Sequence, residues 1–232
     1  AITTSGQLSI RWIEKALNIY LNKLLETKTE DYVVASDTDS VYITFDKLIR
    51  KVFKERKFLS ESERTRNVVG FLDRICREKI EPFIDTSYKH LAKEMIAYDQ
   101  KMVMKREVLA DVGIWVAKKH YVLNVHNSEG VQYDEPKLKI MGIEAVKSST
   151  PEPCRNALKE AFKIMMNGTE DDVINYIESF RKEFRSYSPE EVSFPRSVKG
   201  LAKYYDSATI YQKSTPIHVK GSLIYNKILQ NK

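Results

Sequence analysis

The chain has 232 residues, of which 42% are hydrophobic and 30% charged, and its formal net charge is +6. This composition excludes a disordered chain, and the length suffices for one large domain or two small ones with a buried core. No apolar run approaches the length of a membrane span, and the first residues do not resemble a signal peptide. Cys76 and Cys154 lack metal-ligand spacing, so we expect two reduced thiols in a cytoplasmic protein.

Helical periodicity opens the chain. Apolar residues recur at helical spacing over residues 8–25, which predicts an amphipathic helix with Thr4 or Ser5 as its cap. Two β-branched and aromatic runs, residues 32–36 and 41–45, then flank a polar turn and predict a β-hairpin.

Further helices and strands follow. Residues 46–57 and 61–98 have helical patterns, and Pro82 predicts a kink or break in the second. From residue 101 to 125 apolar residues alternate with polar ones, beginning at Met102 and Met104, which predicts strands. The expected turns are Asp111-Val112-Gly113 and Asn127-Ser128-Glu129-Gly130.

The last part of the sequence is predicted to be mostly helical. A helix is expected to start at Thr150-Pro151, with Pro in its first position, and to end before Gly168. Residues 169–172 and 188–191 have the pattern of capping boxes at two further helix starts. The predicted fold class is therefore α+β.

The positive charge is concentrated near the carboxyl end. Residues 193–232 hold seven of the 38 Lys/Arg residues and one of the 32 Asp/Glu residues, so the whole excess lies there. A basic segment that also contains tyrosines predicts a polyanionic partner. A solvated surface gives the same pattern, so both interpretations stay open.

The hairpin turn carries the clearest chemical pattern. Asp37 and Asp39 lie two residues apart, and extended spacing would direct both carboxylates to one side. Carboxylate oxygens suit Mg²⁺, and a pair of such ions can hold the attacking and leaving oxygens of phosphoryl transfer. Asp and Thr are also ordinary turn residues, which is the alternative interpretation.

The residues around this turn resemble motif C of family B DNA polymerases, a strand–turn–strand usually written Tyr-Gly-Asp-Thr-Asp-Ser. Asp37-Thr38-Asp39-Ser40 match that motif, and an apolar strand follows. Four more segments resemble the same family, in the family's order. They are residues 1–7 (downstream of motif B), 118–121 (the Lys-Lys-Arg-Tyr motif), 136–151 (the palm-to-thumb junction of tailed-phage members) and 216–226 (a thumb segment).

The resemblance implies an architecture and a set of roles. Residues 1–142 would be part of the palm, with an antiparallel sheet and packed helices, and residues 143–232 a mostly helical, incomplete thumb. Asp39 would be the principal ligand in a site for two Mg²⁺ ions, with Asp37 beside it and Glu107 as a further carboxylate. The expected DNA-binding residues are Thr38, Lys118, Lys119, Tyr121, Lys139, Lys147 and Lys220.

Several of these residues have a second interpretation. Glu107 would also be explained as an ion-pair partner of Arg106 or Lys105. Two lysines on a strand usually form a solvated face. However, Tyr121 would share that strand face with Lys119, and a cation beside an aromatic ring suits contact with a nucleic-acid backbone. We expect His120 to be a lone exposed histidine.

The sequence also departs from the family pattern. Ala35-Ser36 replace Tyr-Gly, whose Gly lets the backbone approach the primer end closely, and His120 replaces an Arg. Motif A, motif B and a proofreading exonuclease lie outside this chain. Since the first residue is Ala1 rather than Met, we expect a piece of a longer polypeptide or one part of a split polymerase.

These observations give one leading hypothesis. The chain would be the palm and thumb part of a DNA-directed DNA polymerase that acts in the cytoplasm, of the host if it comes from a phage. Its expected partners are primer-template DNA, a deoxynucleoside triphosphate and an amino-terminal part carrying motifs A and B, with no membrane. The alternatives are a non-catalytic module that binds duplex DNA and an unrelated DNA-binding domain.

Overall fold

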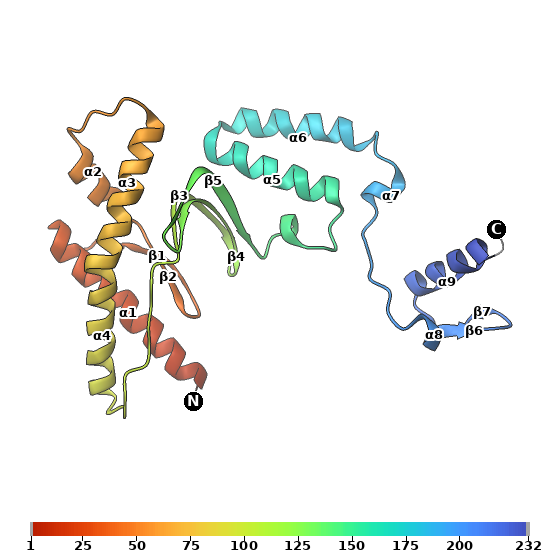
Figure 1. Cartoon of the computed structure of the whole chain (residues 1–232), viewed down its shortest axis with the longest axis horizontal. Coiled ribbons are helices and arrows are strands. Elements are labelled where there is room, and N and C mark those ends of the chain that lie inside the picture. Colours follow the sequence, from red (N-terminus) through yellow and green to blue (C-terminus); the bar gives the residue numbers. More distant parts are fainter. Residues whose placement is uncertain (1, 231–232) are drawn as a thin grey trace. The chain divides into compact units, whose positions relative to one another are not determined.

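The computed structural model describes residues 2–230, and it divides into two compact units between Met141 and Gly142. The predicted α+β class is confirmed, since helices and small antiparallel sheets make up the molecule (Figure 1). The elements of the first unit are α1 (Ile2–Leu25), β1 (Val33–Asp37), β2 (Ser40–Ile43), α2 (Asp46–Phe53), α3 (Glu61–Ile75), the π-helical turn η1 (Cys76–Ile80), α4 (Glu81–Glu94), β3 (Val108–Ala117), β4 (His120–Ser128) and β5 (Val131–Met141).

Helix α1 supplies the centre of the first core. Ile13, Leu17 and Leu21 are fully buried at helical spacing, as the periodicity predicts. The helix begins at Ile2, so the prediction that Thr4 or Ser5 caps it is wrong and both lie within the first turns.

Polar contacts of Trp12 and Asn18 connect α1 to its neighbours. Trp12 Nε1 donates to the carbonyl oxygen of Ser87 on α4 at 3.1 Å. The side-chain oxygen of Asn18 accepts from the backbone N–H groups of Tyr32 and Val33, at 2.7 and 3.1 Å. The start of strand β1 is therefore fixed on α1, and with it the hairpin that ends in the Asp-Thr-Asp turn.

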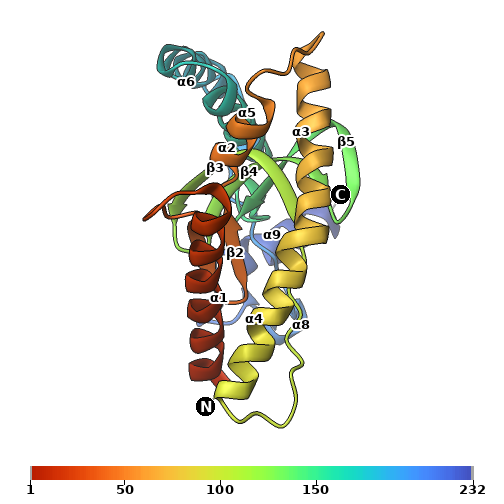
Figure 2. The same ribbon diagram turned by 90° about the vertical axis from the view of Figure 1, so that its left-hand side faces the viewer.

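Helices α3 and α4 are joined through η1 into one long rod, with α1 beside α4 (Figure 2). The N–H of Glu81 donates to the carbonyl oxygen of Cys76, five residues earlier, as in a π-helix. Pro82 follows directly and has no N–H to donate. The helical path continues through Pro82 without the break that was one of the two predictions, and a π turn lies just before the proline.

The three-stranded sheet has the order β3-β4-β5, and both of its junctions are antiparallel. Glu129 and Gly130 join β4 to β5 with φ of 50° and 92°, which confirms the predicted turn at residues 127–130. Met102 and Met104 lie in an irregular segment before β3, so the predicted strand there is wrong. Alternation marks an extended chain, but this segment has no partner strand within the described residues.

The predicted turn at Asp111-Val112-Gly113 is also wrong. Strand β3 continues through these residues with a bulge, because Ala110 pairs with Val125 whereas Gly113 pairs with Leu123. A Cβ added at Gly113 would come within 2.7 Å of the Trp115 ring. The glycine therefore serves close packing inside the sheet rather than a turn.

The second unit consists of the 3₁₀ turn η2 (Glu144–Val146), α5 (Glu152–Asn167), α6 (Glu170–Phe184), α7 (Pro189–Val192), α8 (Leu201–Tyr204), β6 (Tyr205–Asp206), β7 (Ile210–Tyr211) and α9 (Ile217–Gln230). Both predicted capping boxes are confirmed, with Thr169 at the start of α6 and Ser188 at the start of α7. Gly168 follows α5 as predicted, whereas that helix begins one residue later than expected, after Pro151 as its cap.

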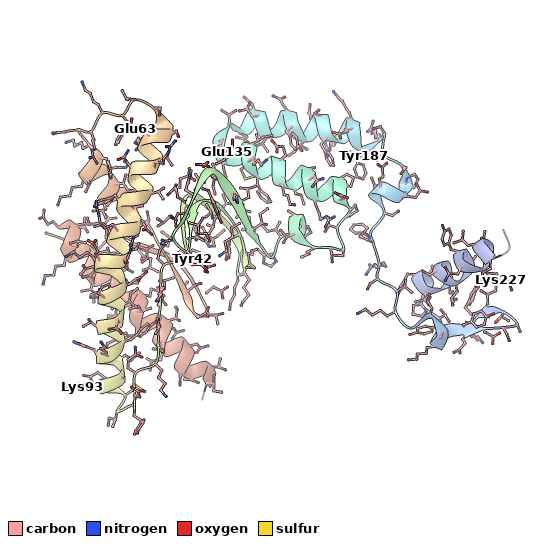
Figure 3. All side chains as sticks on the ribbon, in the orientation of Figure 1. Tyr42, Glu63, Lys93, Glu135, Tyr187 and Lys227 are labelled. Carbon is pink, nitrogen blue, oxygen red and sulfur yellow. The ribbon has the colours of Figure 1, made fainter. Side chains whose placement is uncertain are left out.

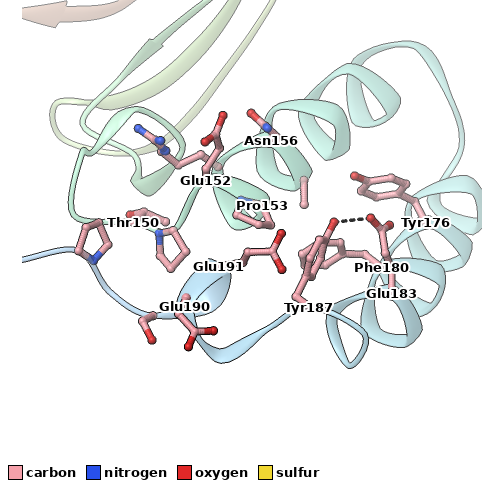
Figure 4. A pocket seen from close by; sticks show the side chains of 15 residues that line it. Thr150, Glu152, Pro153, Asn156, Tyr176, Phe180, Glu183, Tyr187, Glu190 and Glu191 are labelled. Carbon is pink, nitrogen blue, oxygen red and sulfur yellow. Dashed lines mark hydrogen bonds between the residues drawn. The ribbon is translucent and has the colours of Figure 1, made fainter. Parts of the chain in front are cut away.

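A cavity of about 630 Å³ lies between α5, α6 and α7 in this unit (Figure 4). Tyr176, Phe180 and Tyr187 contribute aromatic rings, and the Tyr187 hydroxyl donates to Glu183 at its edge. None of the predicted site residues lines this cavity. Within residues 2–230, no helix has both the length and the apolar character needed to cross a membrane.

Candidate active site

The Asp-Thr-Asp turn closes the β1–β2 hairpin, whose last pair is Asp37 with Ser40. Thr38 has a φ of 54°, and the N–H of Asp39 donates to the carbonyl oxygen of Asp37 at 2.6 Å. The Ser40 hydroxyl donates to the same carbonyl oxygen at 3.1 Å, and the Thr38 hydroxyl donates to Asp37 Oδ1 at 3.0 Å. Local hydrogen bonds therefore fix the turn and orient the Asp37 carboxylate.

The two carboxylates differ in surroundings. The Asp37 side chain is 24% exposed at the end of β1, whereas Asp39 is exposed in the turn itself. The extended spacing behind the expectation that both carboxylates point to one side ends at Asp37, because Thr38 has a φ of 54° and leaves the extended conformation. Within residues 2–230, no third His, Cys, Asp or Glu gathers with them into a group that could hold a metal ion.

Lys119 lies beside this turn. It belongs to the connection between β3 and β4, where its φ is 62°. Its Nζ is 3.6 Å from Asp37 Oδ1 and 3.4 Å from Thr38 Oγ1. Two segments that both carry predicted site residues are thus brought together although they lie far apart in the sequence.

The lysine pair has a different setting from the predicted strand. Lys118 and Lys119 form the turn that connects β3 to β4, and both are exposed. His120 opens β4 half-buried, and its Nδ1 lies 2.8 Å from the carbonyl oxygen of Lys118. The prediction that Lys119 shares a strand face with Tyr121 is therefore wrong, since only Tyr121 lies on the strand.

Tyr121 is part of an aromatic cluster between the hairpin and the three-stranded sheet. It is 7% exposed, and its ring lies edge-on to that of Tyr42 on β2, with centroids 5.5 Å apart. Tyr42 is labelled in Figure 3. Trp115 on β3 also contacts Tyr42 edge-on at 5.3 Å. Burial, together with a hydrogen bond to Tyr121, raises the pKa of Tyr42 to about 12. Sequence reasoning missed Tyr42 and Trp115 in this role; their place in strands that border the two turns was the available signal.

Glu107 precedes β3 and forms an ion pair with Lys139 on β5. The alternative that its carboxylate pairs with Arg106 or Lys105 is wrong, because the guanidinium of Arg106 pairs with Asp73 instead. Lys139, expected to touch phosphate, is therefore engaged with a carboxylate in the structure.

The two remaining predicted lysines lie in the second unit. Lys147 pairs with Glu144 in the 3₁₀ turn, three residues earlier. The Nζ of Lys220 on α9 lies 4.9 Å from the ring centroid of Tyr211. The charged end of Lys220 is thus held beside an aromatic ring.

Comparison with known proteins decides the family. The profile of the Divergent Family B DNA polymerase family matches residues 21–183. This chain belongs to that family. It is 40% identical over 238 residues to the DNA-directed DNA polymerase of Escherichia phage RB69, a match that covers 99% of this chain and 26% of that protein.

A second relative gives the same result. The DNA-directed DNA polymerase of Enterobacteria phage T4 is 37% identical over 235 residues, covering 98% of this chain and 26% of that protein. The chain thus spans about a quarter of the length of either relative. The sequence resemblance to a phage-type family B polymerase is confirmed over nearly the whole chain.

Proposed function

We propose that this chain is the palm and thumb part of a DNA-directed DNA polymerase, with residues 1–142 as palm and residues 143–232 as thumb. Together with a polypeptide that carries motifs A and B, it adds deoxynucleotides to a primer end in the cytoplasm of the host cell. The observation that carries the proposal is the turn Asp37-Thr38-Asp39 with Lys119 against it, in a chain 40% identical to a phage polymerase.

In the proposed reaction, the primer 3′-oxygen forms a bond to the α-phosphorus of a deoxynucleoside triphosphate. The bond from that phosphorus to the bridging oxygen breaks, and pyrophosphate leaves. Two Mg²⁺ ions, when bound, would lower the pKa of the 3′-hydroxyl and stabilise the charge on pyrophosphate. Asp39, which is exposed, would be the principal ligand with Asp37 as its oriented neighbour, and the third carboxylate would come from motif A.

In this proposal, residues around the turn bind the primer-template DNA. Lys119 places a positive charge within 3.6 Å of Asp37, at the point where the primer end would lie. Lys118 is exposed in the same turn and free to meet phosphate or a groove edge. The ring of Tyr121 is buried and packs against Tyr42, and Lys139, Lys147 and Lys220 are further proposed contacts to the DNA backbone.

Reconstitution tests the catalytic role. The chain is mixed with a polypeptide carrying motifs A and B, and Mg²⁺-dependent primer extension is measured. Asp39→Asn is expected to lower the rate at least about a hundredfold, because a metal ligand is lost. Asp134→Asn, an exposed change on β5, is the matched control and should leave the rate unchanged. Extension that survives Asp39→Asn would show the metal role to be wrong.

A second candidate function has its own observation. Ser36 stands where the family has Gly, and its hydroxyl donates to Glu14 on α1 at 3.4 Å. If this side chain keeps the primer end away, the chain is a duplex-binding module without catalysis. A reconstituted mixture that is inert, while the chain alone binds duplex DNA with a steep dependence on salt, would favour this function.

A further inference from the structure

Arg106 stands at the root of the three-stranded sheet, where the chain enters β3. Its guanidinium pairs with Asp73 on α3 and donates to the side-chain oxygen of Asn127 at 2.6 Å. Its backbone N–H donates to Glu81 Oε1 at the start of α4 at 3.0 Å. The side chain is 12% exposed, so these contacts are largely shielded from water.

The π turn brings the two carboxylates to one arginine. Asp73 and Glu81 are eight residues apart, which in a regular α-helix puts them roughly 80° apart around the axis. The wider turn η1 lies between them and accommodates one extra residue. That extra residue reduces the difference to roughly 20°, so both carboxylates face the same strand entry.

On the sheet side, Asn127 carries the contact into the β4–β5 turn. Its side-chain oxygen accepts from Arg106 and also from the N–H of Gly130, at 3.1 Å. The N–H of Glu129 donates to the carbonyl oxygen of Glu107 at 2.7 Å. Arg106 thus fixes β3, β4 and the β4–β5 turn together on the helical rod.

The other end of the same hairpin carries Lys119. Strand β3 runs roughly 25 Å from Leu109 to Ala117, at about 3.3 Å per residue. Its pairing with β4 continues to Ala117 and His120 at the tip. A rotation at the root is therefore amplified at the tip, where Lys119 reaches Asp37.

We propose that Arg106 is a positioning residue: it clamps the root of the β3–β4 hairpin to the α3–η1–α4 rod, and thereby holds Lys119 at the Asp37-Thr38 turn. The proposal deepens the proposed function, on which it rests for the role of Lys119 toward DNA. The contact between Lys119 and Asp37 can be measured without any polymerase activity, so the two can fail separately.

Zero-length crosslinking of the complete chain tests the clamp. A carbodiimide joins a lysine amine to a carboxylate in contact, takes up the water that is lost, and leaves an amide that peptide mass spectrometry identifies. In the unmodified chain we expect a crosslink between Lys119 and Asp37. Arg106→Gln should lower its yield at least about fivefold, because the shielded ion pair at the root is lost.

Internal and matched controls separate the clamp from general damage. The crosslink between Lys89 and Asp85, an ion pair within α4, should keep its yield in every variant. Arg77→Gln is the matched control, because Arg77 pairs with the same Asp73 but has a 69% exposed side chain and no contact with the sheet within the described residues. An unchanged Lys119–Asp37 yield in Arg106→Gln would show that the aromatic contacts of Tyr42 alone hold the tip, and the clamp would be wrong.

A second variant keeps the test decisive if Arg106→Gln fails to fold. Asn127→Ala removes the sheet-side contact of Arg106, together with the contact to Gly130, and leaves the pair of Arg106 with Asp73 intact. It should also lower the Lys119–Asp37 yield, with the Lys89–Asp85 yield unchanged. A yield equal to that of the unmodified chain would overturn the proposal.

Duplex binding then tests the link to function. The dissociation constant of primer-template DNA is measured for Arg106→Gln, Lys119→Gln and the double variant. We expect each single change to weaken binding several-fold and the double variant to bind like Lys119→Gln, because Arg106 acts through Lys119. If the losses of binding free energy in the two single variants add up fully in the double variant, Arg106 does not act through Lys119. Unchanged binding by Lys119→Gln would instead count against the proposed DNA contact and leave the crosslinking result standing.

Discussion

Helices α1 and α6 differ in how they are stabilised, and the difference extends to the two units that contain them. Three residues of α1 are fully buried at the centre of a core that collects side chains from α3, α4 and both hairpin strands. All fifteen residues of α6 are described, and none of them is buried. The first unit is therefore stabilised by contacts between distant segments, and α6 mainly by its cap and its immediate neighbours.

This contrast matches the chemistry that each unit carries. The turn with Asp37 and its neighbour Lys119 need fixed positions, which a shared core and an aromatic cluster supply. In the second unit, lysines of the basic segment 193–232 lie on α8 and α9, which suits the polyanion binding that we propose. The proposed catalytic turn thus lies in the unit with the shared core, and the basic segment lies in the other unit.

The largest expected effect is the loss of stability when a fully buried residue of α1 is truncated. Leu17→Ala should lower the free energy of unfolding of the first unit by about 2–5 kcal/mol, because it opens a cavity at a fully buried position. Urea unfolding followed by tryptophan fluorescence measures this unit selectively, since Trp12 and Trp115 are the two tryptophans of the sequence. Ile177→Ala, 45% exposed on α6, is the comparison; its unit has no tryptophan, so circular dichroism follows its unfolding, and the midpoint should stay unchanged. A similar loss in both variants would contradict the contrast.

The two cysteines, one in each unit, give a chemical test. Cys76 is buried in the first core, and burial raises the pKa of its thiol to about 11. Cys154 on α5 is partly exposed. At pH 8 we expect a thiol reagent to label Cys76 at least about a hundredfold more slowly than Cys154. Little of the Cys76 thiol is deprotonated at this pH, and its burial keeps the reagent away. Cys154→Ser isolates the slow reaction, and comparable rates would show that the first core opens readily.

The smallest effect concerns the cap of α6. Hydrogen bonds from the Thr169 backbone and hydroxyl lower the pKa of Asp172 below its ordinary value of 3.8. The carboxylate therefore stabilises α6 above that value, and the contribution is lost as the pH falls through the lowered pKa. Circular dichroism during acid titration should show less helix loss in this range for Asp172→Asn. Asp171→Asn, a neighbouring change outside the capping box, should titrate like the unmodified chain.

Local signals in the sequence predict much of this fold. Alternation around a polar turn predicts the β1–β2 hairpin, and Ser188 and Thr169 predict two helix starts because a cap depends on residues within one turn. The turn predicted at Asp111-Val112-Gly113 is wrong because these residues, although typical of turns, form a bulge within strand β3. The geometry of a bulge depends on the partner strand, which the local sequence does not reveal. The strand predicted at Met102 and Met104 is wrong because alternation of apolar and polar residues does not reveal whether a partner strand exists.

The candidate site divides in the same way. Asp37, Thr38 and Asp39 are contiguous, so their spacing and the family resemblance identify them together. The contact of Lys119 with Thr38 joins residues 81 positions apart, and the ion pair with Asp37 lies beside it; both arise from how two hairpins pack through Tyr42 and Tyr121. Spacing along the chain contains no information about such a contact. The pairing of Glu107 with Lys139 likewise depends on the register of β5 beside β4.

The backbone conformation of Thr38 has a consequence for how this turn evolves and how it can be redesigned. A β-branched residue at a φ of 54° carries roughly 1–2 kcal/mol of backbone strain, which glycine would relieve. Glycine would also remove the hydroxyl that donates to Asp37 and accepts from Lys119. Selection for thermal tolerance and selection for a correctly oriented carboxylate therefore oppose each other at this one position, so a sequence optimised for stability alone would discard the side chain that links the two turns.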